Sequence, residues 1–240
     1  MSNVSNLNHK LFLKKGWAIK SSIQVKEGGE VISGGKFSPD NWHPTSIPST
    51  VLNALVKNGV YPDPRPGMNN FLIPDASDNF NARYNLSKYS HLPDKRNPWK
   101  DPYWYRTEFK LPDAYKGKII WLIFKGINYR ADVWFNGNKI AHSKNMAGMF
   151  QRFKFNITDY AKPGENNYLA VKIYNVDHIG DPGPPQMKIS GRPRSYDKQI
   201  HKDVTLKISG GWDCAPVVRD RNMGIWQDVY IKTTGPIDIR

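Results

Sequence analysis

The sequence predicts an all-β protein, an antiparallel sandwich or barrel with one short helix and long loops. Apolar and polar residues alternate along several short segments, and turns separate these segments without intervening helices. Of the 240 residues, 39% are apolar and 12% are aromatic, which is enough for a large packed core and argues against intrinsic disorder. Because β-sandwiches of this length commonly form one domain, we expect a single domain.

Strand patterns recur along the chain. Tyr103–Leu111 alternates with period two, which predicts a strand buried on one face. Asn136-Gly137 interrupts the segment Ala131–Ile140, which predicts a β-hairpin, because a type I′ turn needs positive φ at both central residues. The other predicted strands are Gly16–Ser22, Gly35–Phe37, Ile119–Phe124, Phe153–Ile157, Leu169–Ile173, Val204–Ile208 and Asp228–Lys232.

Signals for helices are few and signals for loops are strong. Ser49 or Thr50 can cap a helix over Val51–Asn58, and Gly59 suits the position after its end. Two further stretches, Tyr61–His91 and Ile179–Arg194, are rich in residues typical of turns and are expected to be long ordered loops. Long loops in a compact β domain are more often functional than idle.

The charge distribution argues against nucleic acid as a partner. The chain has 35 Lys and Arg against 21 Asp and Glu, a net charge of +14. These basic residues come singly or in pairs, such as Lys14-Lys15 and Lys95-Arg96, and no recognition-helix pattern is visible. We expect a solvated basic surface and no nucleic acid, although a basic nucleic-acid binder stays open as a third hypothesis.

Other classes are also limited by the sequence. No stretch approaches the ~18 consecutive apolar residues that span a bilayer, so we expect no membrane partner. The segment Met1–Lys10 is polar and lacks the features of a signal peptide, so a leader is absent or already removed. The single cysteine, Cys214, excludes an internal disulfide and leaves the redox compartment open.

We predict no catalytic residues, no metal and no cofactor. Four glutamates occur, Glu27, Glu30, Glu108 and Glu165, and no two carboxyl groups form a credible acid and base pair. Most aspartates stand in turn contexts, where they cap backbone amides. The histidines lack metal-ligand spacing, and His43 beside Trp42 is interpreted as packed structure.

A loop near the C-terminus carries the best binding signal. Gly210 and Gly211 precede Trp212 and Asp213. An indole offers a flat apolar face to sugar C–H groups, and a carboxylate can accept hydrogen bonds from two hydroxyls. Trp212 and Asp213 therefore form a candidate sugar-binding pair, and the alternative is that Trp212 fills the core while Asp213 caps a turn.

Four motifs in chain order resemble the N-terminal sugar-binding domain of glycoside hydrolase family 2. They are Trp104–Phe109, Gly126–Gly137, Phe153–Thr158 and Gly164–Val171. Five more segments narrow the resemblance to the β-mannosidase and exo-β-glucosaminidase branch: Pro48–Leu52, Gly59–Pro64, Gly67–Asn70, Gly211–Asp213 and Asp220–Trp226. The resemblance covers nearly the whole chain and implies a jelly-roll, galactose-binding-like sandwich.

This resemblance implies roles for single residues. In that branch a Gly-Trp-Asp loop reaches the pocket on a barrel domain, where its Asp contacts hydroxyls of the terminal sugar, which implies substrate binding by Asp213 and Trp212. The branch usually has another aromatic residue after this Asp, and Cys214 stands there instead, which leaves the shape of the pocket and the sugar open. Asn222 and Arg221 match the motif and are interpreted as loop anchors.

The resemblance also implies partners. Family enzymes continue with an immunoglobulin-like domain and a (β/α)8 barrel that carries both catalytic glutamates of a retaining mechanism. We expect residues 1–240 to be one non-catalytic sugar-binding domain, inactive alone, that ends before those domains and contributes to a pocket for a terminal β-linked sugar. An apolar area near Gly210–Trp226 is expected as the contact. Related bacterial enzymes are often periplasmic or secreted, and the compartment stays open.

The alternative function is a free-standing carbohydrate-binding module. It is suggested by the aromatic residues of the loop and by the compact sandwich. In a half-formed pocket, stacking and a few hydrogen bonds support only weak binding, roughly millimolar.

Overall fold

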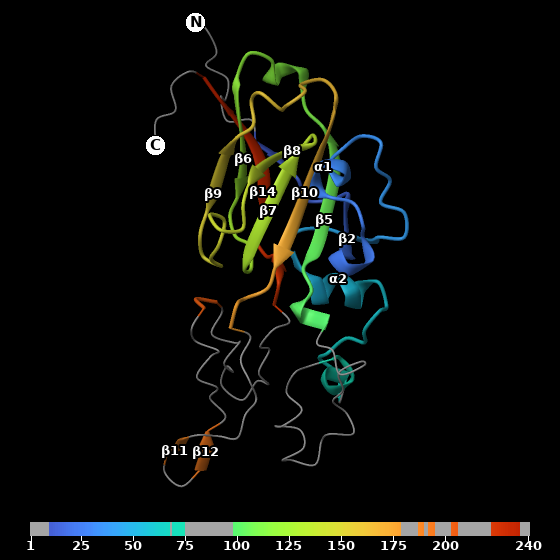
Figure 1. Cartoon of the computed structure of the whole chain (residues 1–240), viewed down its shortest axis with the longest axis vertical. Coiled ribbons are helices and arrows are strands. Elements are labelled where there is room, and N and C mark those ends of the chain that lie inside the picture. Colours follow the sequence, from blue (N-terminus) through green and yellow to red (C-terminus); the bar gives the residue numbers. More distant parts are fainter. Residues whose placement is uncertain are drawn as a thin grey trace, which may run out of the picture.

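The computed structural model describes residues 10–67, 69–74, 98–178, 187–189, 192–194, 203–205 and 222–235. Antiparallel strands dominate these residues, and the predicted all-β class is confirmed. Figure 1 shows the two larger sheets as layers of a sandwich. The helices are α1 (Gly29–Ile32) and α2 (Val51–Lys57), with 3-10 turns η1 (Ser22–Gln24), η2 (Asn69–Leu72), η5 (Pro98–Lys100) and η6 (Asp113–Tyr115). The strands are β1 (Lys10–Phe12), β2 (Trp17–Ser21), β3 (His43–Thr45), β4 (Ser49–Thr50), β5 (Tyr103–Lys110), β6 (Ile119–Phe124), β7 (Arg130–Phe135), β8 (Asn138–Ala141), β9 (Phe153–Asn156), β10 (Asn166–Tyr174), β11 (Met187–Ile189), β12 (Arg192–Arg194), β13 (Gly224–Ile225) and β14 (Val229–Thr234).

The strand order joins distant parts of the chain. A six-stranded sheet has the order β3-β2-β5-β10-β7-β8, and a four-stranded sheet has the order β1-β14-β6-β9. In the six-stranded sheet, β10 lies between β5 and β7 and pairs antiparallel with both. In the four-stranded sheet, β14 pairs with β1 on one side and with β6 on the other. The N-terminal and C-terminal strands of the sandwich are therefore direct neighbours.

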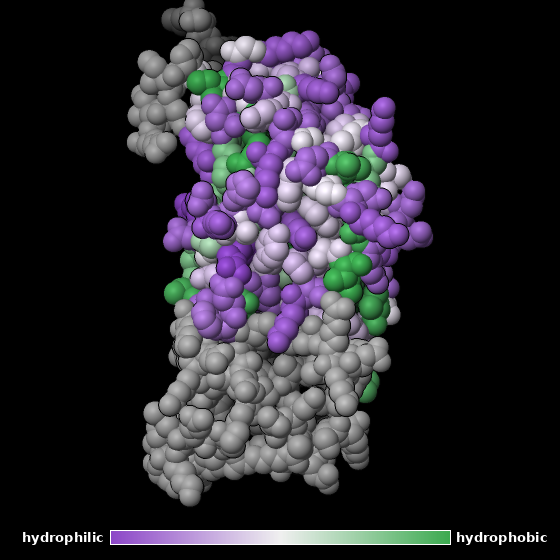
Figure 2. All heavy atoms as spheres, viewed as in Figure 1, coloured by the Kyte–Doolittle hydropathy of each residue, from purple (hydrophilic) through white to green (hydrophobic). Residues whose placement is uncertain are grey.

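The core lies between the two sheets. Along β6, half-buried residues alternate with the buried residues Ile120, Leu122 and Phe124, as expected for a strand with one face in the core. The largest fully buried side chains are aromatic and include Trp17 and Tyr105. Burial of apolar area supplies the main stabilisation, at about 25 cal/mol per Å². Figure 2 shows the surface outside this core. Hydrophilic side chains cover most of the described surface in this view, and apolar side chains form small separate groups.

Local sequence signals account for two of the elements. Asn136 and Gly137 have φ of 49° and 85° in the turn between β7 and β8, so the predicted hairpin is confirmed. The Thr50 hydroxyl accepts a hydrogen bond from the Asn53 N–H at 3.1 Å and caps α2, and Gly59 follows the helix with φ of +70°. The predicted helix is therefore confirmed as well.

Three predictions of local structure need correction. Gly35–Phe37 is not a strand. It begins with a turn, and the Phe37 carbonyl accepts a hydrogen bond from the side chain of Arg106 on β5. Val204 and Thr205 lie outside any strand, and the rest of the predicted strand Val204–Ile208 lies outside the described residues. Ile179–Arg194 is not wholly irregular, because β11 and β12 pair within it.

The outer face of the six-stranded sheet is covered, contrary to the prediction that β5 is buried on one face. Trp104 and Arg106 point to that outer face and are 3% and 5% exposed. Trp104 packs against Trp134, with 5.2 Å between the ring centroids, and Ile32 of α1 belongs to the same buried cluster. The segment around α1 therefore forms a third layer over this sheet.

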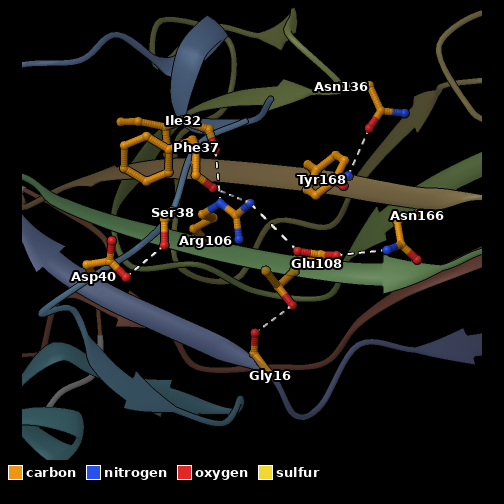
Figure 3. Close-up of polar contacts among 11 residues, drawn as sticks. Gly16, Ile32, Phe37, Ser38, Asp40, Arg106, Glu108, Asn136, Asn166 and Tyr168 are labelled. Carbon is orange, nitrogen blue, oxygen red and sulfur yellow. Dashed lines mark hydrogen bonds and ion pairs between the residues drawn. The ribbon is translucent and has the colours of Figure 1, made fainter. Parts of the chain in front are cut away.

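Arg106 attaches that third layer to the sheet (Figure 3). Its Nε donates to the Ile32 carbonyl at 3.1 Å, and one Nη donates to the Phe37 carbonyl at 3.1 Å. The guanidinium lies 5.4 Å from the Tyr168 ring centroid and 3.9 Å from a Glu108 carboxylate oxygen. Burial lowers the pKa of the Arg106 guanidinium, and the Glu108 carboxylate opposes that shift.

Replacement of Arg106 by Met should weaken the fold. The substitution Arg106→Met leaves the carbonyls of Ile32 and Phe37 without this donor, so the free energy of unfolding should fall by about 2–4 kcal/mol in urea titrations. The control Lys110→Met, at the exposed end of the same strand, should change it by less than about 0.5 kcal/mol. Equal effects of the two variants would contradict the role of Arg106.

Candidate functional site

The predicted binding residues Trp212 and Asp213 lie outside the described residues. Arg221 and most of the expected apolar area at Gly210–Trp226 lie outside them too, so these interpretations stay predictions. The structure does describe both flanks of the segment, since residues 203–205 precede it and residues 222–235 follow it.

The flanks of three loops lie at one end of the sandwich. At this end β5 begins, β10 ends and β7 begins, because Tyr103 pairs with Ile173 and Arg130 pairs with Tyr174. In the other sheet, β6 ends here and β14 begins, because Phe124 pairs with Val229. The chain before β5, the chain after β10 and the chain before β14 therefore all join the sandwich at the lower end in Figure 1.

The flank that follows the segment, which begins at Asn222, is held by main-chain hydrogen bonds. The Asn128 N–H donates to the Gly224 carbonyl at 2.8 Å, and the Gly224 N–H donates to the Asn128 carbonyl at 2.7 Å. The side-chain amide of Asn128 donates to the Asn222 carbonyl at 3.0 Å. On the other side, Gly224 and Ile225 pair with β4. Asn222 thus takes part in the anchor, as interpreted from the sequence, and does so through its carbonyl.

Only glycine fits at position 224. Its φ is +150°, and a Cβ there would lie 2.7 Å from the Thr50 Cα and 2.8 Å from the Tyr105 hydroxyl oxygen. Tyr105 also donates a hydrogen bond to the Ser49 carbonyl at 3.2 Å, so the space below Gly224 is already filled by buried groups. The close approach of the returning chain to β4 depends on the missing side chain.

The flank that precedes the segment, residues 203–205, is held by a carboxylate. The His178 N–H donates to Asp203 Oδ2 at 2.7 Å, and the His178 Nδ1 lies 3.1 Å from the same oxygen. The Asp203 side chain is 9% exposed. Beside it, Arg130 Nη1 donates to Asp177 Oδ2 at 2.6 Å. Asp203 is therefore tied to the chain that follows β10, and Asp177 ties that same chain to the start of β7.

The ionisable groups at this end have structural partners. Burial raises the pKa of the Asp132 carboxyl, but hydrogen bonds from the Ser143 N–H and the Tyr174 hydroxyl and the charge of Lys139 outweigh it, so the net pKa is lowered. Burial first, and the bond to Asp132 second, raise the pKa of Tyr174. Burial also raises the pKa of Tyr103. The bond between Tyr174 and Asp132 joins β10 to β7, and these groups are not arranged as an acid and base pair.

An aromatic pair at this end was not predicted. The Trp226 indole N–H donates to the Met149 carbonyl at 3.0 Å, and its ring lies edge-on to Phe150 with centroids 5.8 Å apart. Phe150 is 55% exposed. A Cβ on Gly126 would lie 2.7 Å from the indole nitrogen, so the ring is closely packed on the chain after β6. No periodic pattern marks Phe150, which is why the sequence did not single it out.

The glutamates and the histidine to which the sequence assigned no role have ordinary structural surroundings. Glu30 accepts a hydrogen bond from the Trp134 indole at 2.8 Å, and Glu108 accepts one from Asn166 at 2.9 Å. Burial, then the charge of Lys20, lowers the pKa of His43. Within the described part of the chain, no group of three or more His, Cys, Asp or Glu side chains could hold a metal, and no helix there is long and apolar enough to cross a membrane.

Substitution of Gly224 should disrupt this end of the sandwich. We expect Gly224→Ala to lower the free energy of unfolding by about 3 kcal/mol or more, because the new Cβ overlaps Thr50 and Tyr105. The matched control Gly59→Ala also has positive φ but meets nothing within 4 Å, so it should cost only about 1 kcal/mol. Chemical denaturation measures both, and equal losses would show that close packing at Gly224 is unimportant.

Comparison with known proteins agrees with this architecture. Residues 88–227 match the family described as glycosyl hydrolase 2 galactose-binding domain-like. The chain is 33% identical over 235 residues to a mannosylglycoprotein endo-beta-mannosidase from Lilium longiflorum, covering 96% of this chain and 22% of that protein. It is 29% identical over 226 residues to an exo-beta-D-glucosaminidase from Amycolatopsis orientalis, covering 94% of this chain and 17% of that protein.

Solved structures give the same result. The exo-chitosanase CsxA of Amycolatopsis orientalis superposes with a TM-score of 0.68 at 27% identity, over 97% of this chain and 21% of that one. The chain thus spans about a fifth of the length of these relatives. It matches the N-terminal domain of family 2 glycosidases. Because the family match covers more than half of its residues, the chain belongs to the glycosyl hydrolase 2 galactose-binding domain-like family.

Proposed function

We propose that this chain is the non-catalytic N-terminal domain of a retaining exo-β-glycosidase. In this role it supports a barrel domain encoded further along the parent chain and contributes the loop with Trp212 and Asp213 to the pocket for a terminal β-linked sugar. The proposal includes an immunoglobulin-like domain between this chain and the barrel, which would carry both catalytic glutamates. The chain alone would then be inactive.

The observation that carries this proposal is the double anchoring of the loop. The flank before it is tied to β10 through His178 and Asp203, and the flank after it is tied to Asn128 through Gly224. Both flanks lie at the same end of the sandwich. A carboxylate that has to meet sugar hydroxyls on another domain needs such fixed ends, because misplacement by about 1 Å can cost 100-fold in rate.

The relatives give separate support to a role within a larger enzyme. Two of them are named as glycosidases, and the chain spans 22% of one and 17% of the other. One is named endo-acting and the other exo-acting. The preference for an exo-acting parent rests on the Gly-Trp-Asp motif, in which Asp213 would contact the terminal sugar.

The function of Asp213 can be tested in the full parent enzyme. We expect Asp213→Ala to lower kcat/KM on aryl β-glycosides about 100-fold or more, because hydrogen bonds to charged groups contribute about 1.5–3 kcal/mol each. The control Asp159→Ala removes an exposed carboxylate from a turn after β9 and should leave kcat/KM and the melting temperature unchanged. A normal kcat/KM in a folded Asp213→Ala enzyme would overturn the proposed pocket role.

A free-standing carbohydrate-binding module is the second candidate. The exposed Phe150 beside Trp226 favours it, since aromatic rings at a loop end can stack on sugars. On our proposal, the isolated 240-residue chain should neither release product from aryl β-glucosaminides or β-mannosides nor bind their oligosaccharides more tightly than roughly millimolar. Calorimetric titration measures the binding, and tighter affinity that is lost in Trp212→Ala would favour the module instead.

A further inference from the structure

A groove lies in the layer around α1 that covers the six-stranded sheet. Its volume is about 480 Å³, within the range of about 300–1,000 Å³ that is typical of sites for small ligands. One segment that leads into α1 and one segment that follows α1 line the groove, and both belong to the continuous described range 10–67. We call it the α1 groove; the side chains that line it are those of Glu27, Glu30, Val31, Lys36, Phe37 and Ser38.

The α1 groove and the loop end of the sandwich lie at opposite ends of β7. The Gly137 N–H donates to the Ser33 hydroxyl at 3.0 Å, so the residue after α1 adjoins the turn between β7 and β8. The flanks of residues 206–221 instead meet the sandwich where β7 begins, at Arg130 and Tyr174. Figure 1 shows α1 in the upper part of the sandwich, away from this lower end.

Both segments that line the α1 groove are fixed to the sheet. In α1, Glu30 Oε1 accepts a hydrogen bond from the Trp134 indole at 2.8 Å. After α1, the Phe37 carbonyl accepts one from Arg106 at 3.1 Å (Figure 3). A groove whose sides are held before a ligand arrives loses less conformational entropy on binding.

The α1 groove offers acceptors from one segment and a donor from the other. Glu27 and Glu30 contribute carboxylates, and Lys36 contributes an ammonium group. A hydrogen bond from its own main-chain N–H, and then the bond from Trp134, lower the pKa of the Glu30 carboxyl, so it is ionised at neutral pH. Glu27 and Lys36 are exposed, and within the described part of the chain neither takes part in a hydrogen bond or an ion pair. Both groups are therefore available to a ligand.

An apolar side chain is exposed among these charged groups. Val31 is 54% exposed, although its neighbour Ile32 is fully buried. The Phe37 ring already contacts the Trp42 ring and lies 5.8 Å from the Arg106 guanidinium. Val31 is therefore the side chain of the groove that can gain most from apolar contact with a ligand.

The charges at the α1 groove nearly balance. The carboxylates of Glu27 and Glu30 are offset by Lys36 and by Lys139, whose charge acts on Glu30. A ligand of either charge gains little from such a site. A hydroxyl group suits it better, because a hydroxyl can donate to a carboxylate and accept from an ammonium group.

We propose that the α1 groove binds a stretch of an uncharged β-linked glucan. The hydroxyls of such a chain point to its sides and its C–H bonds point to its faces, so hydroxyls would pair with Glu27 and Lys36 while a C–H face packs on Val31. Membership of a glycosyl hydrolase family favours a glucan over a peptide, which offers similar polar groups. The proposal does not depend on the pocket role of Asp213.

The test titrates cellohexaose into the 240-residue chain and follows the main-chain amide signals by NMR. We expect an affinity of roughly millimolar, because few groups contact the ligand, and shifts confined to residues 27–38 and their contacts. The affinity should be the same at low and at moderate salt, because the ligand carries no charge for salt to screen. Absence of binding, or shifts that lie elsewhere in the chain, would overturn the proposal.

Two further ligands test the chemistry of the ligand. Oligogalacturonate of the same length carries carboxylates, and a Gly-Ser hexapeptide carries amide groups without sugar rings. We expect cellohexaose to shift the signals of residues 27–38 at a lower concentration than either of them. Equal or tighter binding of oligogalacturonate at these residues would overturn the choice of an uncharged ligand, and equal or tighter binding of the peptide would overturn the choice of a sugar.

Matched double variants locate the site. Glu27→Ala/Lys36→Ala removes one carboxylate and one ammonium group and keeps the net charge, so cellohexaose binding should weaken about fivefold or more. The control Glu165→Ala/Lys57→Ala removes the same two charges from exposed positions elsewhere and should change the affinity less than about twofold. Urea unfolding of each variant identifies any loss of fold. Equal losses of affinity in the two folded variants would overturn the site.

A variant at the other end of the sandwich separates this proposal from the pocket role of the loop. Trp212→Ala should leave the cellohexaose shifts of residues 27–38 unchanged, whatever the outcome for Asp213 in the parent enzyme. A folded Trp212→Ala chain in which these shifts disappear would assign the glucan to the loop end and overturn the α1 groove as its site.

Discussion

The pair of main-chain hydrogen bonds between Asn128 and Gly224 is the constraint on which the loop end of the sandwich depends. These bonds join the connection after β6 to the chain that returns to β14, residues that are far apart in sequence. The bonds form only because Gly224 lacks a side chain and can lie against Thr50 and the Tyr105 hydroxyl. A buried main-chain amide that loses its partner costs about 1–3 kcal/mol, so this contact favours one path for the returning chain.

The outer faces of the two sheets differ in the burial of their charged side chains. On the six-stranded sheet, Arg106 binds the carbonyls of Ile32 and Phe37 and is buried under the layer around α1. On the four-stranded sheet, Lys154 is exposed, and its Nζ lies 3.9 Å from the centroid of the Trp121 ring. A buried guanidinium with two acceptors stabilises a fixed packing, whereas an exposed ammonium group above a ring keeps its contact with water.

Elements with local signals could be predicted from the sequence, and elements with distant partners could not. The hairpin at Asn136-Gly137 and the helix capped by Thr50 depend on residues within a few positions of each other. The burial of Trp104 depends on Trp134 and Ile32, which no alternating pattern reveals. Gly35–Phe37 was also predicted wrongly, and the Phe37 carbonyl there accepts a hydrogen bond from Arg106, which lies far along the chain. At the candidate site, the motif and its resemblance suggested Asp213, while the Asn128 contact that anchors the loop came only from the structure.

Hydrogen bonds that fix the flanks of a loop reduce the conformational entropy that the loop loses when one of its residues binds substrate. Ordering the backbone of a free residue costs about 1–2 kcal/mol of conformational free energy. A loop that becomes ordered only on binding would therefore lose much of the binding free energy that one carboxylate contributes. Here His178 and Asp203 fix one flank and Asn128 fixes the other before any sugar arrives. These interactions are internal to the sandwich, so both flanks of the loop are held without a contact from a neighbouring domain. Under the proposed function, a domain without catalytic groups would affect catalysis through the fixed flanks of the loop that carries Asp213.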